Sequence, residues 1–361
     1  MSKHEKYTRL KRQIGLCLAM GVALFSAVPM AFAATSVVAN NQLPTGGTPM
    51  HDNTTITPNL PAGSTMPQNP VMDITQTVHN EVIKWHDFSI GGSATVNFKG
   101  PEGYNTLNYV VGTGNISQIY GTINAINNGN IYIVNPAGVQ IGNSAQINVG
   151  SLYVSTKYLD ESKFGQFKGG NLSALYDTTS KMPSNAELMS LGNINATNVT
   201  FEGDGRIVID TERLKDTSGH DKLTAGKIIV NTAGDTDKLI VGYDAYDKTN
   251  GSYAGKNNTD AIATVNGNDF TKQNGYMWVE DVDQLQAINT NLGGNYALRN
   301  SIDATGTVAS GFNPIGLDSN TGKVNVENGN YGFYGKFDGM DYNIFGLTIK
   351  QRRIVKLSAT F

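Results

Sequence analysis

The chain has 361 residues, a formal net charge of −3 and only 16% charged residues. Residues 1–33 hold five basic residues and one acidic residue, so the remaining chain has 22 bases against 29 acids, a balance of −7. This excess of acid excludes proteins that bind nucleic acid or anionic membranes through a basic face. The 41 glycines and the few charges favour short strands joined by tight turns.

Residues 1–33 have the pattern of a signal peptide. A basic start precedes an apolar run, Ile14–Val28, and the small-x-small sequence Ala31-Phe32-Ala33 follows it. The run is shorter than the roughly 20 residues that span a bilayer, so a retained membrane anchor is the less favoured alternative. The sequence therefore predicts export with cleavage between Ala33 and Ala34, and no retained membrane span.

The only cysteine, Cys17, lies within this apolar run, so the chain after cleavage has none. Residues 34–71 contain six prolines among Thr, Gly and Asn and are predicted to form an extended leader or cap. Within them, Thr54–Thr57 favours a strand.

Residues 72–250 consist of short apolar pairs that alternate with polar residues and are interrupted by Gly or Asn. The phrases Gly121–Ala125, Ala145–Val149 and Gly192–Ala196 are near-copies, and the first two are 24 residues apart. Loose repetition at this spacing is typical of a solenoid, and strands of four or five residues with Ile and Val favour a parallel β-helix. An antiparallel β-sandwich shares this texture and is the alternative. The predicted inward residues are Ile131, Ile133, Val139, Ile141, Ile147 and Val149.

Four further segments depart from this pattern. Residues 155–190 interrupt the strands and are predicted to project from the coil, and residues 251–275, rich in Gly, Asn and Lys, are predicted to be a linker. In residues 276–350, Asp281 and Gln284 predict the start of a short helix. A strand at Tyr296–Leu298 and a turn at Phe337–Gly339 follow. Residues 351–361 form an irregular tail.

The stretch Ile83–Thr156 contains four characteristic phrases: Ile83-Lys-Trp85-His-Asp-Phe88-Ser-Ile-Gly91, Ile116-Ser-Gln-Ile-Tyr-Gly121, Ile131-Tyr-Ile-Val-Asn135-Pro136-Ala137-Gly138-Val139 and Gln146-Ile-Asn-Val-Gly150-Ser-Leu-Tyr-Val-Ser-Thr156. Through these phrases it resembles the N-terminal secretion domain of two-partner-secretion exoproteins, in the filamentous haemagglutinin and high-molecular-weight adhesin branch. The family hallmark is Asn-Pro-Asn-Gly-Ile, so this chain departs from it at Ala137 and Val139.

This resemblance implies an all-β fold, a right-handed parallel β-helix of the pectin-lyase-like type, with a short α+β C-terminal repeat. It also implies a partner outer-membrane transporter that recognises the domain through its periplasmic domains. The protein is then secreted or exposed on the outer-membrane surface of a Gram-negative-type cell. We expect an adhesin or haemagglutinin that binds a host-surface protein or glycan.

Residues 276–350 contain the phrases Val282–Asn289, Asn295–Leu298, Phe312–Gly316 and Phe337–Ile349. Through these phrases they resemble a GLUG-type adhesin repeat, named for its Gly-Leu-any-Gly motif. Family members are usually much longer, so a chain with one partial repeat suggests a truncated, frameshifted or fragmentary version.

The candidate site is the motif Asn135-Pro136-Ala137-Gly138. Proline fixes φ, glycine frees it and an Asn side chain caps such turns, so the motif serves equally as a plain structural corner or as a transporter-recognition element.

No catalytic residue, metal site or cofactor is predicted. His79 and His86, near Glu81 and Asp87, lack a recognised ligand spacing. Turns are also the favoured interpretation of Gly203-Asp204-Gly205 and Asp235-Thr-Asp237, over calcium sites. The alternative function is a β-helical carbohydrate-active enzyme similar to polysaccharide lyases, for which Arg206, Asp210 and Arg213 are the only candidate trio.

Overall fold

The computed structural model describes residues 38–111, 114–179, 186–219, 223, 225–233, 236–253, 259–318, 323–327 and 329–349. The predicted signal peptide, its cleavage site at Ala33 and Ala34, and the tail 351–361 lie outside these residues. The chain divides into two compact units. The solenoid unit comprises Thr35–Gly242 and Asp260–Gly275, and the C-terminal unit includes Tyr243–Thr259 and Tyr276–Phe361.

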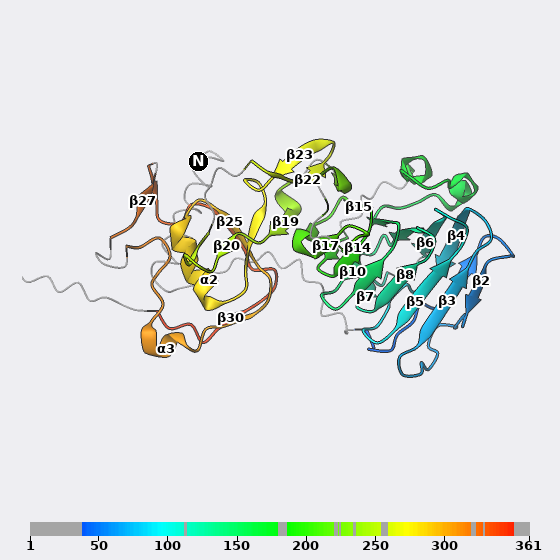
Figure 1. The fold of residues 1–361 in the computed structure, drawn as a ribbon, viewed down its shortest axis with the longest axis horizontal. Coiled ribbons are helices and arrows are strands. Elements are labelled where there is room, and N and C mark those ends of the chain that lie inside the picture. Colours follow the sequence, from blue (N-terminus) through cyan, green and yellow to red (C-terminus); the bar gives the residue numbers. More distant parts are fainter. Residues whose placement is uncertain are drawn as a thin grey trace, which may run out of the picture. The chain divides into compact units, whose positions relative to one another are not determined.

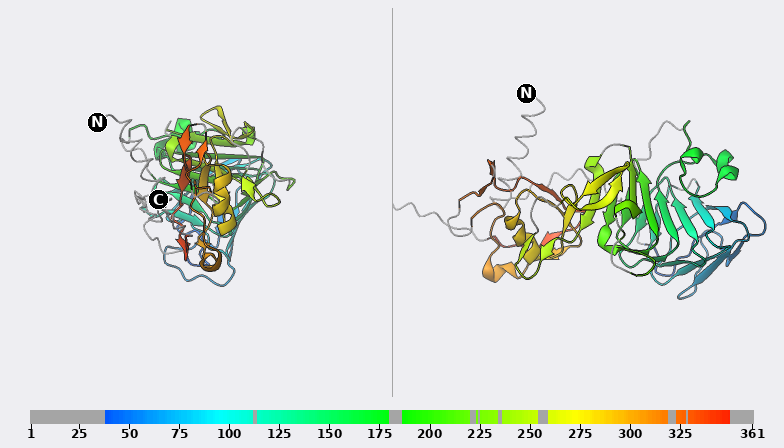
Figure 2. Two further views of the ribbon diagram at one scale, coloured as in Figure 1. Left: turned by 90° about the vertical axis from the view of Figure 1, so that its left-hand side faces the viewer. Right: turned by 45° about the horizontal axis from the view of Figure 1, so that its top comes forward.

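The solenoid unit is built from coils of three strands, and each strand of a coil joins a different sheet. The β8 sheet has the order β17-β14-β11-β8-β5-β3-β2, and the β9 sheet has the order β1-β4-β6-β9-β12-β15-β18-β22-β23. The β10 sheet runs β19-β16-β13-β10-β7 within this unit. Figure 1 shows β3, β5 and β8 side by side, and the right-hand view of Figure 2 shows the strands as parallel ribs.

The strands of the β8 sheet are β2 (Thr55–Thr57), β3 (Val71–Thr75), β5 (Thr95–Lys99), β8 (Thr122–Ala125), β11 (Gln146–Asn148), β14 (Asn193–Asn195) and β17 (Leu214–Lys215). Those of the β9 sheet are β1 (Thr48–Pro49), β4 (Asn80–Trp85), β6 (Asn105–Val110), β9 (Asn130–Val134), β12 (Ser151–Ser155), β15 (Asn198–Gly203), β18 (Ile228–Thr232), β22 (Ala261–Val265) and β23 (Asn268–Thr271). Those of the β10 sheet are β7 (Ser117–Ile119), β10 (Val139–Ile141), β13 (Leu188–Ser190), β16 (Ile207–Asp210) and β19 (Leu239–Tyr243).

Neighbouring coils pair in parallel, which confirms the predicted parallel β-helix and excludes the antiparallel sandwich. The near-copies found in the sequence lie in register, because Ile147 pairs with Ile123 on one side and with Ile194 on the other. The solenoid is a right-handed parallel β-helix, which is the hand that about 98% of parallel crossover connections have.

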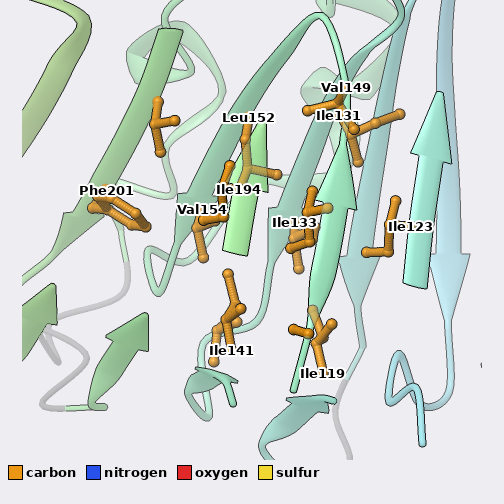
Figure 3. Close-up of a cluster of buried hydrophobic side chains, with 14 of the residues drawn as sticks. Ile119, Ile123, Ile131, Ile133, Ile141, Val149, Leu152, Val154, Ile194 and Phe201 are labelled. Carbon is orange, nitrogen blue, oxygen red and sulfur yellow. The ribbon is translucent and has the colours of Figure 1, made fainter. Parts of the chain in front are cut away.

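The interior of the coil is a ladder of stacked aliphatic side chains. The six residues predicted to point inward are all at most 5% exposed. Figure 3 shows Ile119, Ile123, Ile131 and Ile133 directed into the space between the sheets. Like side chains sit above like because coils stack about 4.8 Å apart. Trp85 and Phe88 close the ladder at the first coils, fully buried and edge-to-face at 5.4 Å between ring centroids.

Asparagine occupies several corners of the coil, as its backbone preferences predict. Asn69, Asn127 and Asn128 have φ of 47°, 56° and 51°, in the left-handed region that Asn tolerates better than most residues. These corners let the chain change direction between sheets within a few residues.

The N-terminal end of the solenoid is capped by antiparallel strands. β1 pairs with β4, and β2, which lies within the predicted strand stretch Thr54–Thr57, pairs with β3. The carboxylate of Glu81 is fully buried and accepts hydrogen bonds from Met50 N at 3.0 Å, Val82 N at 2.9 Å and the Thr54 hydroxyl. Charge-assisted bonds of this kind fix the cap to the first coil.

The segment after β12 leaves the coil, as predicted, but it folds back onto the coil's outer face. Residues 157–179, with the 3₁₀ helices η1 (Glu161–Gln166) and η2 (Ser173–Leu175), pack against the outer face of the β9 sheet. The reason is their apolar content, since Phe164, Phe167 and Leu175 are all at most 6% exposed. In the right-hand view of Figure 2 the two green helical turns lie beside the ribs of the solenoid.

The segment predicted to be a linker contains ordered strands. β22 pairs in parallel with β18 and forms an antiparallel hairpin with β23, so both belong to the solenoid. Asn266, with φ of 48°, and Gly267 make the turn of this hairpin, as an Asn-Gly pair is expected to do. The shorter 3₁₀ helices of the solenoid are η3 (Thr211–Arg213), η4 (Ala225–Lys227) and η5 (Thr236–Lys238).

In its described residues, the C-terminal unit combines short strands, paired in parallel or antiparallel, with two short α-helices. Its elements are β20 (Tyr246–Asp247), β21 (Ser252–Tyr253), β24 (Tyr276–Val279), α2 (Val282–Ala287), η6 (Ile288–Thr290), β25 (Asn295–Leu298), β26 (Ile302–Asp303), α3 (Thr307–Ser310), β27 (Val326–Glu327), β28 (Asn330–Tyr331), β29 (Lys336–Asp338) and β30 (Ile344–Phe345). Asp281 caps α2 by accepting a hydrogen bond from Gln284 N at 2.8 Å, as the sequence predicts.

The predicted turn at Phe337–Gly339 is displaced by two residues. Phe337 lies inside β29, and the chain turns at Gly339–Tyr342, where Met340 and Asp341 have positive φ. β29 and β30 do not pair with each other. They pair in parallel with β25 and β26, because this unit is also coiled.

Candidate functional site

The Asn-Pro-Ala-Gly motif forms the corner between β9 and β10. Asn135 is 2% exposed, and its side-chain Nδ2 donates to the Asn115 carbonyl at 2.9 Å and the Ser117 hydroxyl at 3.0 Å. Its Oδ1 accepts from the Ala137 N–H at 2.9 Å. Gly138 closes the turn with φ of 132°, which favours glycine. The buried amide of Asn135 therefore joins the corner to the preceding coil.

The same corner is also joined to the following coil through the backbone. Asn135 N donates to the Ser155 carbonyl at 3.0 Å, and Val139 N donates to the Glu187 carbonyl at 3.1 Å. The chain therefore leaves the next coil after Ser155 and is back in that coil at Glu187, and both residues lie directly beside the motif. Ala137, where this chain departs from the family hallmark, is half-exposed. The corner therefore forms without the amide that the hallmark has at this position.

Two ion pairs lie in the coils that follow the motif. Arg206 Nη1 lies 3.1 Å from Glu187 Oε1, and Lys157 is paired with Asp204. Asp204 belongs to the stretch Gly203–Gly205, for which a turn was the favoured interpretation over calcium, and its carboxylate is bound by a lysine. Asp237 lies in η5, and Asp235 lies outside the described residues. The two pairs therefore hold opposite charges together in the coils that follow the corner.

The residues of the candidate lyase trio have structural partners. Asp210 is 1% exposed, and it caps η3 by accepting a hydrogen bond from Glu212 N at 3.1 Å. Arg213 Nε lies 3.7 Å from Asp210 Oδ2, whereas Arg206 is paired with Glu187. The geometry does not bring the three side chains together around one carboxylate.

The histidine pair also fails to converge on one site. His79 and His86 are exposed, whereas the neighbouring Glu81 is buried in the N-terminal cap. His51, which the sequence did not single out, lies 3.2 Å from Glu81 through Nδ1. Across the part of the chain that the structure describes, no group of three or more His, Cys, Asp or Glu residues is arranged to hold a metal.

Sequence reasoning missed an aromatic cluster on the outer face of the β9 sheet. Tyr132 and Tyr153 stack at 5.5 Å between ring centroids, and Tyr153 donates to the carboxylate of Glu202. Burial, followed by the charge of Glu202, raises the pKa of Tyr153 above its ordinary range. Burial raises the pKa of Tyr109 to about 12. The signal was present in Ile131–Val134, because strands that are apolar on both faces are covered on both faces.

The fold is a right-handed parallel β-helix with the corner motif between β9 and β10. Residues 48–330 match the family model of the TPS secretion domain, and since the match covers more than half of the chain, the chain belongs to this family. The match extends beyond the β-helix into the C-terminal unit. Among the described residues, no helix is long and apolar enough to cross a membrane.

Curated relatives and a solved structure come from one genus. A heme/hemopexin-binding protein of Haemophilus influenzae is 29% identical over 165 residues, 46% of this chain and 18% of that protein. A second heme/hemopexin-binding protein of Haemophilus influenzae is 41% identical over 90 residues, 25% of this chain and 9% of that protein. The chain thus spans less than a fifth of the length of these relatives. The HMW1 secretion domain of Haemophilus influenzae is similar with 15% identity and a TM-score of 0.38, over 72% of this chain and 73% of that one.

Proposed function

We propose that this chain directs the export of a two-partner-secretion exoprotein through a dedicated outer-membrane transporter. The observation that carries this proposal is the continuous register of the coils, in which Ile123, Ile147 and Ile194 stack in successive strands. Each new coil buries apolar side chains and pairs with the open edge of the previous one. A chain delivered N-terminus first therefore folds outside the cell with a free-energy gain at each coil, and needs no ATP at the outer membrane.

The proposal is tested by expressing the full chain with and without its partner transporter and measuring the protein in the medium. We expect export to be lost without the transporter. Equal amounts in the medium after deletion of every candidate transporter contradict the proposal.

The recognition region proposed is Ile83–Thr156, with the corner Asn135–Gly138 as its most specific element. Two substitutions separate recognition from a plain corner role. Asn135→Ala removes the buried amide, and a transport defect in a variant that still folds favours recognition, whereas misfolding favours the plain corner. Ala137→Asn restores the family hallmark at a half-exposed position. If the transporter reads this side chain, export rises without a change in stability.

Beyond export, we propose that the protein acts as an adhesin on the bacterial surface, with a host-surface protein or glycan as its ligand. The GLUG-like phrases of residues 276–350 support this proposal, because repeats of this type occur in bacterial adhesins. The coiled parallel pairing of β25 with β29 is compatible with such a repeat. Binding of the purified chain to host cells, lost when residues 276–350 are replaced, is the expected result.

The second candidate function is a β-helical enzyme that acts on polysaccharides. The buried, helix-capping role of Asp210 speaks against it, because a catalytic carboxylate must reach the substrate. A screen on plant and bacterial polysaccharides tests this alternative. Reproducible cleavage that disappears in Asp210→Asn establishes the enzyme in place of the adhesin.

A further inference from the structure

The coils of the solenoid form a stack in which neighbours pair with neighbours. Along the β9 sheet the order is β4-β6-β9-β12-β15, and the ladder hydrogen bonds of β4 toward the later coils go to β6. The stability of such a stack is approximately a sum of terms for single coils and for adjacent pairs, so coils at the ends open one at a time. A contact that reaches across several coils changes this behaviour, because one coil then opens only if others lose contacts too.

Residues 157–179, here named the strap, lie along the outer face of the β9 sheet and reach back as far as β4. Lys84 Nζ in β4 lies 3.3 Å from Glu161 Oε2 in the strap. Both side chains are nearly half exposed, so water screens this ion pair, which contributes little to stability. Apolar side chains supply the attachment. They are Val82, Leu107, Tyr109, Tyr132, Val134 and Tyr153 on the strands, with Leu159, Phe164, Phe167, Leu172 and Leu175 on the strap.

Successive aromatic side chains of the strap pack on successive strands of the sheet. Phe164 packs edge-to-face on Tyr109 of β6 at 5.3 Å between ring centroids, and Phe167 packs on Tyr132 of β9 at 5.1 Å. The Tyr132 hydroxyl accepts a hydrogen bond from Gly170 N at 2.6 Å. Aromatic pairs of this geometry stabilise a structure beyond the area that they bury. The strap is thus attached to two coils through separate contacts.

The strap is also attached near its end, and it holds its own shape. Tyr176 belongs to a hydrogen-bonded group with Tyr153 of β12 and Glu202 of β15. The two ends of the strap meet, because Leu159 and Tyr176 form an antiparallel bridge. Segments whose ends meet in this way are compact Ω-type loops. The strap therefore undocks as one body, and undocking breaks its contacts with β6, β9 and β12 at the same time.

We propose that the strap makes the coils of β4, β6, β9 and β12 one cooperative unit that opens as a whole. Without the strap, β4 separates from β6 and leaves β9 and β12 unchanged. With the strap, separation of one coil removes part of the face on which the strap rests and weakens its contacts with the others.

This unit has a consequence for export, which rests on the export function proposed above. The strap follows β12 directly in the chain, so its docking completes the unit before the later coils have emerged. A chain that leaves the cell N-terminus first then has four coils outside the cell that do not unravel one by one.

Native-state hydrogen exchange of the full chain, measured by mass spectrometry at rising urea concentration, tests the proposal. We expect the backbone amides of the four strands to share one free energy of opening and one urea dependence. Phe164→Leu with Phe167→Leu weakens both aromatic contacts of the strap. The shared value should then split, with exchange in β4 and β6 about tenfold faster than in the unaltered chain.

Phe201→Leu is the matched control, because it makes the same change at a fully buried position inside β15. It should speed exchange in β15 and in β18, with which β15 pairs, and leave exchange in β4 unchanged.

Tyr132→Phe guards against a strap variant that fails to fold. It keeps the ring and removes the acceptor of the Gly170 hydrogen bond, so we expect the same split with a smaller change. The proposal is overturned if the four strands open separately in the unaltered chain, or if they still open together in both strap variants. Export that needs the transporter, combined with strand exchange unaffected by the strap variants, refutes only this inference. Export that needs no transporter refutes the proposed function itself.

Discussion

Ile147 and Asn148 are neighbours on β11 that the structure places on opposite faces, so they provide a matched pair of substitutions. Ile147 is fully buried between Ile123 and Ile194. Ile147→Ala removes three carbon groups from the ladder, which costs about 2.4 kcal/mol of transfer free energy at about 0.8 kcal/mol each. The cavity left between two fixed coils raises the expected loss to about 3–4 kcal/mol.

Asn148→Ala acts on the exposed face of the same strand. It removes a hydrogen bond to Asn124 at 3.0 Å and one from Asn195 at 2.6 Å. Water replaces both bonds on an exposed face, so the free energy of unfolding falls by less than about 1 kcal/mol. Ile147→Asp marks the opposite extreme, because an unpaired buried carboxylate costs several kcal/mol.

Urea unfolding followed by circular dichroism measures these differences. A register error of one residue exchanges the inward and outward faces of a strand. Equal reductions of the unfolding midpoint by Asn148→Ala and Ile147→Ala would therefore refute the coil register described above. A mainly helical spectrum of the unaltered chain refutes the β-helix itself.

Three further predictions concern the corner, alkaline pH and the cap. Gly138→Ala combines backbone strain with a Cβ 3.0 Å from Ile116 and should lower stability by about 1–3 kcal/mol, measured by thermal unfolding. Gly103 has φ of 65° and open space where a Cβ would lie, so Gly103→Ala should lower stability less than Gly138→Ala. An equal loss of stability contradicts a steric role for the corner. Burial raises the pKa of Tyr109 to about 12, so the folded state favours the neutral phenol. The contribution of this effect to the free energy of unfolding is fully present below the ordinary pKa of tyrosine and is lost as the pH rises from about 10 to 12. A pH titration followed by phenolate absorbance, in which no tyrosine ionises above the ordinary pKa of tyrosine, contradicts this prediction. Glu81→Gln should speed hydrogen exchange across residues 48–57, whereas unchanged exchange shows that the carboxylate does not fix the cap.

The repeat of the coil was predictable because its physical cause is local. Ile and Val must recur at the same place in each coil, and the near-copies ending at Ala125, Val149 and Ala196 show this directly. The capped start of α2 was predictable for a local reason too, because Asp281 and Gln284 have the spacing of a helix N-terminus. The corner at Asn135 was predicted as a turn from its residue types alone. Its hydrogen bonds show that the Asn135 amide joins the corner to the preceding coil.

The outer face of the β9 sheet was not predicted, because its cause is not local. Tyr132 and Tyr153 alternate with the inward residues, but nothing in the strands says which segment covers them. The cover comes from residues 157–179, whose irregular sequence was interpreted as a projection. The strands β22 and β23 were missed for a related reason, since a Gly- and Asn-rich stretch serves a hairpin as well as a linker.

The antiparallel cap has a consequence for how molecules of this shape associate. A bare parallel coil has two different ends that complement each other, so copies add head to tail in a heterologous contact that does not close and grows into fibres. β1 and β2 reverse the strand direction at the N-terminal end, and Pro49, on an edge strand, lacks the N–H that a further strand needs. The cap thus opposes head-to-tail addition of a second copy at the N-terminal end of the solenoid.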